Sequence, residues 1–141
     1  MIRFMPATQN ALKWANQHIE CSLAEDARGI IALRDDIPVA AYILQNWTET
    51  SVQAHQAILD PLVLKHGFFE EVLKYIFDEA GRELIIGLTP ADNAKAVKLN
   101  RHYGFKEHSR IPNAVRLGVD MIIFTMHRDE CSYYEGNRHA A

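Results

Sequence analysis

Cysteine is rare in this sequence: Cys21 and Cys131 lie near opposite ends of a chain of 141 residues. They form no CxxC pair and no zinc-binding pattern. A domain of this length buries roughly two-thirds of the surface that its unfolded chain exposes, so it needs neither a disulfide nor a metal to be stable. We therefore expect two free thiols in a reducing compartment, and no metal site.

Excess positive charge and long apolar runs are also missing. The chain has 15 Lys and Arg residues against 18 Asp and Glu residues, a formal charge of −3. This balance provides no electrostatic footprint for nucleic acid or an anionic membrane. No apolar run approaches the roughly 20 residues of a membrane helix, and residues 1–10 lack the pattern of a signal peptide. We expect a cytoplasmic protein with neither nucleic acid nor membrane as partner.

Short apolar segments bounded by turn residues predict the strands of a sheet. Asp35 and Asp36 form a turn pair between two such segments, which indicates an antiparallel hairpin. In residues 51–58 apolar side chains alternate with polar ones such as His55, so this strand should have one apolar and one polar face. The predicted strands cover residues 2–5, 29–33, 39–44, 51–58, 84–88, 105–110 and 119–126.

Three helices are predicted between these strands, over residues 8–24, 67–81 and 92–104. Each begins at a capping residue or glycine, and the last two end at a glycine. The order is β-α-β-β-β-α-β-α-β-β, in which the strand–helix–strand crossover implies a parallel pair within a mixed sheet. We predict a single α/β (α+β) domain over residues 1–130, followed by a loose tail over residues 131–141.

The segment around residues 58–71 is the best candidate for binding chemistry. A strand ends there, a turn follows, and Gly67 begins a helix. The first amides of a helix have no internal partners and carry the positive end of its dipole, so they suit an anion such as a pyrophosphate. Lys65 and His66 add charge or donors beside them. The alternative is a glycine that serves turn geometry alone.

Two stretches resemble the GNAT superfamily of acyl-CoA-dependent N-acyltransferases. ILDPLVLKHGFFEEVLKYIFDEAG resembles the family's V-x-P-x-x-[RQ]-x-x-G-x-[GA] turn and the helix after it, with the spacing from Pro61 to Gly67 preserved. NAKAVKLNRHYGF resembles the family's N-x-x-A-x-x-L-Y-x-K-x-G-F segment, with matches at Asn93, Ala96, Leu99, Gly104 and Phe105. The order of elements agrees over nearly the whole chain. Within the superfamily the sequence is most similar to small acetyltransferase-like proteins of bacteriophages.

The resemblance implies a mostly antiparallel sheet of six or seven strands with a V-shaped splay and helices on both faces. It also implies that acetyl-CoA or another acyl-CoA is the co-substrate. Asn93 would lie near the pantetheine arm, and a backbone N–H near Ile58 or Leu59 would polarise the thioester carbonyl. The pyrophosphate would meet the backbone amides of Lys65, His66, Gly67, Phe68 and Phe69. The acceptor would be the amine of a small molecule or a peptide, and the protein could form a homodimer.

The resemblance further implies acyl transfer within a ternary complex, which needs a general base for the amine. His55 is our candidate, because it lies on the polar face of the strand that bounds the splay; the alternative is a histidine on a solvated sheet face. Glu49 and Asp120 are the other acids and bases considered. Asn100 stands where many members have the tyrosine that protonates the departing thiolate, so that role would pass to water or to Tyr103.

Two more positions depart from the family pattern. Leu64 stands where the family has Arg or Gln, and Phe69 stands where it has a second Gly or Ala, so Phe69 either narrows the pyrophosphate cradle or turns into the core. A non-catalytic CoA-binding or phage virion-associated module of the same fold is therefore the alternative function, and a purely structural domain with an empty cleft is the third. The phage resemblance adds the host cytoplasm or a virion as locations.

Overall fold

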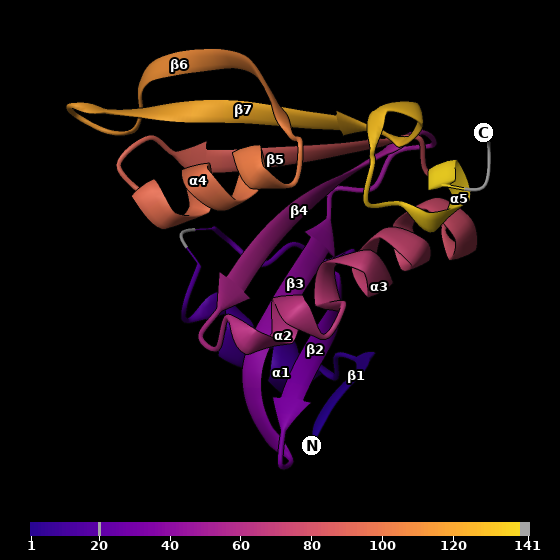
Figure 1. Cartoon of the computed structure of the whole chain (residues 1–141). Coiled ribbons are helices and arrows are strands. Elements are labelled where there is room, and N and C mark those ends of the chain that lie inside the picture. The colour runs from indigo at the N-terminus through magenta and orange to yellow at the C-terminus, as the bar shows by residue number, and fades with distance from the viewer. Residues whose placement is uncertain (20, 139–141) are drawn as a thin grey trace.

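The computed structural model describes residues 1–19 and 21–138 of the chain. Seven strands form one sheet in the order β1-β2-β3-β4-β5-β7-β6, as Figure 1 shows. All neighbours are antiparallel except β4 and β5, which run parallel. The predicted mixed sheet is confirmed, and so is the predicted parallel pair across the strand–helix–strand crossover.

The first half of the sheet consists of hairpins, as the turn residues predict. β1 (Ile2–Pro6) pairs with β2 (Arg28–Arg34), which pairs with β3 (Ile37–Gln45), which pairs with β4 (Ser51–Ile58). Asp35 and Asp36 join β2 to β3 with φ angles of 51° and 67°. Two successive positive φ values are typical of the type I′ turn, whose twist suits a two-residue hairpin.

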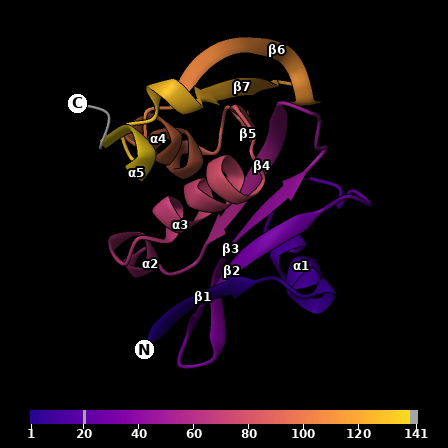
Figure 2. The same ribbon diagram turned by 90° about the vertical axis from the view of Figure 1, so that its right-hand side faces the viewer.

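Helices cover both faces of this half, and Figure 2 shows α1 (Gln9–Asn16) and α3 (Phe68–Lys74) on opposite sides of it. The larger core lies under α3, where Phe68, Phe69 and Leu73 pack on Tyr42 and Leu44 of β3. The smaller core lies under α1. There, Leu12 and Ala15 pack on Ala41 and Ile43. Alternate side chains of β3 therefore serve the two cores in turn, because successive strand residues point to opposite faces.

The second half of the sheet holds β5 (Leu84–Pro90), β7 (Val119–His127) and β6 (Lys106–Arg116), with α4 (Ala94–His102) beside it. β5 pairs with β7 along its whole length, from Leu84 opposite His127 to Pro90 opposite Met121. Its pairing with β4, in contrast, covers three residues and ends at Gln53 opposite Ile86. Beyond that point the two strands diverge, which confirms the predicted V-shaped splay.

The helices depart from the prediction in two places. α1 ends at Asn16, well before residue 24, because residues 22–24 bond to a buried side chain of β3: Gln45 accepts from the Ala24 amide at 2.8 Å and donates to the Ser22 carbonyl at 3.0 Å. The turn after β4 contains a short helix, α2 (Leu62–Lys65). The helix after Gly67 matches the prediction in extent, but its second half, η1 (Tyr75–Glu79), is a π-helix.

The prediction of a loose tail from residue 131 was wrong for the described residues. Cys131 and Tyr134 are 1% and 4% exposed, and both belong to the core under α3. The Tyr134 hydroxyl donates to Asp78, and the Tyr134 ring lies 5.0 Å from that of Phe77. The short helices η2 (Arg128–Glu130) and α5 (Glu135–Arg138) flank these contacts. Residues 139–141 lie outside the described part.

Candidate functional site

The divergence of β4 from β5 leaves backbone groups of β4 free on one side. The Leu59 amide donates to the Val39 carbonyl of β3 at 2.9 Å. Because the donors of a strand alternate in direction, the amides of Ala54, Gln56 and Ile58 point the other way, toward β5. The last pair of the β4–β5 ladder, Gln53 with Ile86, uses the Ala54 amide, whereas β5 has turned aside at Gln56 and Ile58, and no pairing with β5 is found for these two amides among the described residues. Of the two predicted oxyanion donors, the Leu59 amide is used by β3, and the Ile58 amide stays the candidate.

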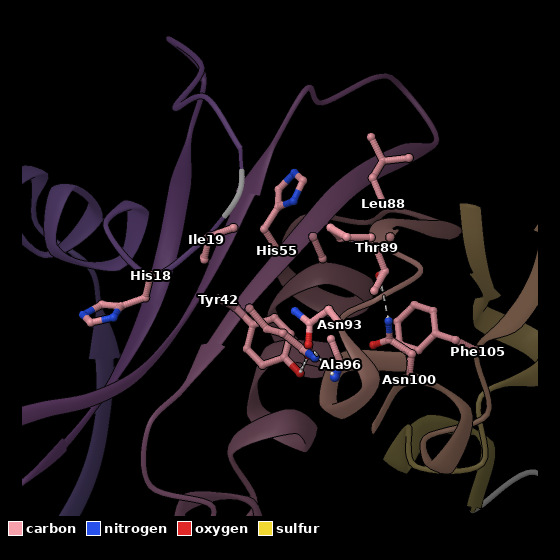
Figure 3. Close-up of a pocket in the computed structure, with 14 residues that line it drawn as sticks. His18, Ile19, Tyr42, His55, Leu88, Thr89, Asn93, Ala96, Asn100 and Phe105 are labelled. Atoms are coloured by element: carbon pink, nitrogen blue, oxygen red, sulfur yellow. Dashed lines mark hydrogen bonds between the residues drawn. The ribbon is translucent and has the colours of Figure 1, made fainter. Parts of the chain in front are cut away.

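A cavity of about 170 Å³ fills the open end of the splay, and we call it the wedge cavity. Figure 3 shows its walls, which come from β3, β4, β5, α4 and the segment that follows α1. Its polar side chains are His18, Tyr42, His55, Gln56, Thr89, Asn93 and Asn100. A second hollow of about 230 Å³ continues from it along the ends of β4 and α4, past Ile58 and Leu99. No carboxylate lines either hollow among the described residues.

His55 lies at the wedge cavity, as the resemblance implies, but its setting differs from the predicted polar face. It is 8% exposed, and its Nε2 atom is buried with no hydrogen-bond partner among the described residues. Its register partner is Ile43, so the ring points to the α1 side of the sheet. Burial lowers the pKa of His55 below its usual value, because it penalises the charged imidazolium. A neutral imidazole with a free nitrogen can accept a proton.

Thr89 and Asn100 lie on the other side of the sheet. Thr89, near the end of β5, is 6% exposed, and Asn100 of α4 donates to its Oγ1 atom from Nδ2 at 3.0 Å. Figure 3 shows His55 directed away from this pair. Asn100 was predicted from the resemblance, whereas Thr89 was missed. Its signal was a polar residue directly after the apolar run of residues 84–88, at the carboxyl end of a buried strand.

The structure does not bring Tyr103 to the wedge cavity. Its ring packs against Phe69 with centroids 4.0 Å apart and against Tyr133, on the α3 side of α4. Burial, followed by the charge of Glu70, raises its pKa to about 12. The tyrosine that does line the cavity is Tyr42, which the sequence analysis missed. Its hydroxyl donates to Gln56 Oε1 at 2.8 Å, and burial raises its pKa as well.

The predicted pyrophosphate cradle is partly occupied by the protein itself. The amides of His66 and Gly67 donate to the carbonyls of Val63 and Leu64, so α2 uses them. Lys65 and His66 are exposed, and Gly67 has a φ of 87° at the N-cap of α3. The amides of Phe68 and Phe69 have no acceptor among the described residues.

The side chains at the start of α3 also affect how an anion could bind at the cradle. Phe68 and Phe69 are fully buried in the core, so Phe69 does not narrow the cradle. Glu70 follows them in the first turn of α3, and its Oε1 atom is buried without a partner among the described residues. Such a carboxylate opposes an anion at the same helix start. A phosphate would therefore sit nearer to Lys65 and the exposed rim than to Glu70.

Asn93 is the one of the three remaining candidates that lies at the wedge cavity. Asn93 caps α4, accepting from the Ala96 amide at 3.2 Å, and it also lines the wedge cavity. Glu49 and Asp120 do not line the cavity. Asp120 of β7 accepts from the Asn113 amide at 3.2 Å, where β6 is irregular between Ile111 and Arg116. The structure therefore concentrates the candidate chemistry on His55, Thr89 and Asn100.

The described residues contain neither a cluster of metal-binding side chains nor a membrane-spanning helix. No cluster of three or more His, Cys, Asp or Glu side chains suited to a metal ion is found there. No helix in this part is long and apolar enough to cross a membrane. Neither Cys21 nor Cys131 forms a disulfide in the described part of the chain.

No protein-family model matches this chain. No curated protein matches it in sequence either. Solved structures do match. The spermidine/spermine N-acetyltransferase SpeG of Vibrio cholerae, solved with manganese ions, is 12% identical with a TM-score of 0.73, over 91% of this chain and 93% of that one.

A GNAT family acetyltransferase of Elizabethkingia anophelis with acetyl-CoA bound is 16% identical with a TM-score of 0.67, over 89% of this chain and 97% of that one. The ribosomal-protein-S18-alanine N-acetyltransferase of Escherichia coli is 18% identical with a TM-score of 0.66, over 90% and 94% of the two chains. The chain therefore has the fold of the GNAT acetyltransferases over nearly its full length.

Proposed function

We propose that this protein is an acyl-CoA-dependent N-acyltransferase that moves an acetyl or other short acyl group to an amine. The observation that carries the proposal is the wedge cavity. It is lined by His55, whose buried Nε2 has no partner among the described residues, and by Gln56, whose amide points into the open splay. Two of the structural neighbours are named for the acetylation of amines, and a third holds acetyl-CoA. The likeness supports the proposal through the fold, and the chemistry rests on the site.

The proposed reaction uses the two sides of the splay. The thioester enters between β4 and β5, and its carbonyl oxygen accepts from a β4 amide, with Ile58 or Gln56 as donor. A neutral amine attacks the carbonyl carbon, and His55 Nε2 takes the amine proton. The C–S bond then breaks and the sulfur leaves with the electron pair. Because burial lowers the pKa of His55, the base is neutral and active down to acidic pH.

The lining of the wedge cavity also bears on which kind of amine is the acceptor. Among residues 1–19 and 21–138, no carboxylate lines the wedge cavity to hold a cation. A neutral amine, such as a peptide N-terminus with an ordinary pKa of about 7.7–8.0, therefore suits it better than a polycation. A homodimer, a phage origin and a location in the host cytoplasm or a virion stay predictions of the sequence.

A non-catalytic CoA-binding module is the second candidate. It is favoured by Glu70 near the cradle, whose buried Oε1 has no partner among the described residues, and by Asn100 in place of tyrosine. One experiment separates the two. The protein is melted with and without acetyl-CoA, and then incubated with acetyl-CoA and a panel of peptides and small amines while free thiol is measured. Ligand at about 100 times its Kd adds roughly 2.7 kcal/mol to stability. Stabilisation with turnover supports the enzyme, stabilisation without turnover supports the module, and no stabilisation contradicts both.

A further inference from the structure

We propose that Thr89, oriented by Asn100, donates the hydrogen bond that stabilises the departing thiolate. The assignment rests on the proposed acyl transfer. Thr89 and Asn100 together take the role that a tyrosine at the Asn100 position has in many members of the family. Thr89 is the donor to the sulfur. Asn100 is a positioning residue, which acts through Thr89.

The direction of one hydrogen bond carries this inference. A threonine hydroxyl has one hydrogen to donate and lone pairs to accept. Asn100 Nδ2 donates to Thr89 Oγ1 at 3.0 Å, so that bond leaves the hydroxyl hydrogen free. No acceptor for this hydrogen is found among the described residues. Thr89 is 6% exposed and lines the wedge cavity, so its free hydrogen is available to a ligand inside it.

The position of Thr89 relative to His55 fits a leaving group. Thr89 shares its sheet face with Ile85, in the core under α3, whereas His55 shares its face with Ile43, in the core under α1. Proton removal from the amine and departure of the sulfur thus occur on opposite faces of the sheet. Both side chains line the same cavity, so one bound thioester can reach both.

The tyrosine hydroxyls near the cavity are either committed or outside it. The Tyr42 hydroxyl already donates to Gln56 Oε1 at 2.8 Å. Tyr103 does not line the cavity. The titratable side chains that face the space are His18, Tyr42 and His55, and no carboxylate lines it in the described part of the chain to oppose an anionic sulfur. Of the two hydroxyls that line the cavity in the described part, that of Thr89 is the one whose hydrogen is free.

The step balances without an acidic side chain. The amine nitrogen bonds to the carbonyl carbon, His55 takes the amine proton, and the electrons of the C–S bond go to sulfur. The thiolate accepts from the Thr89 hydroxyl, and it gains its proton from water after release while His55 returns its own to water. A free thiol has a pKa of about 8.5, so a hydrogen-bonded thiolate is a reasonable leaving group.

Free CoA is the probe, and the pKa of its bound thiol is the readout, measured from the ultraviolet absorbance of the thiolate as pH is varied. A donor to the anion lowers this pKa, whereas a merely structural residue does not move it. We expect the bound thiol pKa to rise by about one unit or more in Thr89→Val, which lacks the hydroxyl, and to stay near that of the wild type in Thr89→Ser.

Asn100→Asp tests the orientation at constant shape. A carboxylate only accepts, so it would take the Thr89 hydrogen and leave the sulfur without a donor. We expect the thiol pKa to rise at least as far as in Thr89→Val. The transfer rate should fall roughly tenfold to a hundredfold in both variants, the usual worth of a hydrogen bond to a charged group, with CoA affinity within about threefold.

The outcomes separate the two proposals. If CoA does not bind the wild type, acyl transfer and the Thr89 assignment fall together. If CoA binds and an amine is acylated, but Thr89→Val leaves the thiol pKa unchanged, the assignment alone is overturned. The assignment would also be overturned if Asn100→Asp had the thiol pKa and the transfer rate of the wild type. In that variant the Thr89 hydroxyl donates to the carboxylate at position 100 and is no longer available to the sulfur. An equal or larger rise in Tyr42→Phe would transfer the role to Tyr42.

Discussion

We expect the proposed base, His55, to lower the free energy of unfolding, and this can be measured without any substrate. His55 Nε2 is buried without a partner among the described residues, and an unsatisfied buried polar group costs about 1–3 kcal/mol. His55→Leu replaces the ring with an apolar side chain of similar size. We therefore expect the free energy of unfolding of His55→Leu at pH 8 to equal that of the wild type or to exceed it by up to about 2 kcal/mol. The same variant should lose acyl transfer by roughly two to four orders of magnitude.

The pH dependence gives the prediction a definite sign. The pKa of His55 is lowered in the folded protein, while the unfolded chain has a value near 6.5. Below that pH the unfolded state binds a proton at His55 that the folded state does not bind. The free energy of unfolding therefore falls as the pH decreases, by up to about 1.4 kcal/mol per pH unit. His55→Leu cannot bind this proton, so its advantage over the wild type should grow as pH falls from 7 to 5.

Urea unfolding at several pH values measures both effects. His108→Gln is the matched control, because that imidazole is exposed on β6 and stays in water in both states. We expect the control to show no pH-dependent change relative to the wild type. A His55→Leu variant that is more than 1 kcal/mol less stable than the wild type at pH 8, or whose difference is independent of pH, would refute the argument from burial.

Three more changes test the fold around the site. Gly67→Val should lower the free energy of unfolding by about 1–2 kcal/mol and Gly67→Asn by less, because the φ of 87° strains a β-branched residue most; urea midpoints for the pair decide this. Tyr134→Phe should cost about 0.5–1.5 kcal/mol in the same assay, since the part-buried bond from the Tyr134 hydroxyl to Asp78 is lost; an unchanged midpoint would mean that this bond contributes nothing. Gln45→Ala should speed proteolytic cleavage within residues 21–26, which its two hydrogen bonds hold, and equal cleavage rates would contradict this.

The parts of the fold that depend on local signals could be predicted from the sequence. The Asp35-Asp36 pair specified its hairpin turn, and the apolar run of residues 84–88 specified a strand buried between layers. The splay followed from the GNAT resemblance. Local periodicity failed where a distant side chain intervened, as at residues 22–24, where Gln45 bonds to the backbone that helical spacing would have used.

The site was harder to predict, because alternation along a strand assigns a face and not its burial. His55 was placed on the correct side of β4, but that side is covered by α1 and neighbouring residues, so the ring is buried. Tyr42 gave no signal, since an aromatic residue in an apolar strand is ordinary core. The role of Thr89 depends on a hydrogen bond from a helix that follows it in the chain, and only the fold brings Asn100 to it.

The claim on which the account depends is that an acyl-CoA occupies the splay between β4 and β5. Gly87 lines the wedge cavity, and a Cβ there would meet the Phe124 Cβ at an ordinary 3.7 Å, so Gly87→Val fills the cavity without straining the backbone. The direct measurement is a calorimetric titration of acetyl-CoA into the wild type, Gly87→Val and a control, Ala11→Leu on α1. We predict binding to the wild type and the control, and affinity at least about tenfold weaker in Gly87→Val, a loss of 1.4 kcal/mol or more. Equal affinity in all three proteins, or no binding to any of them, would contradict the account.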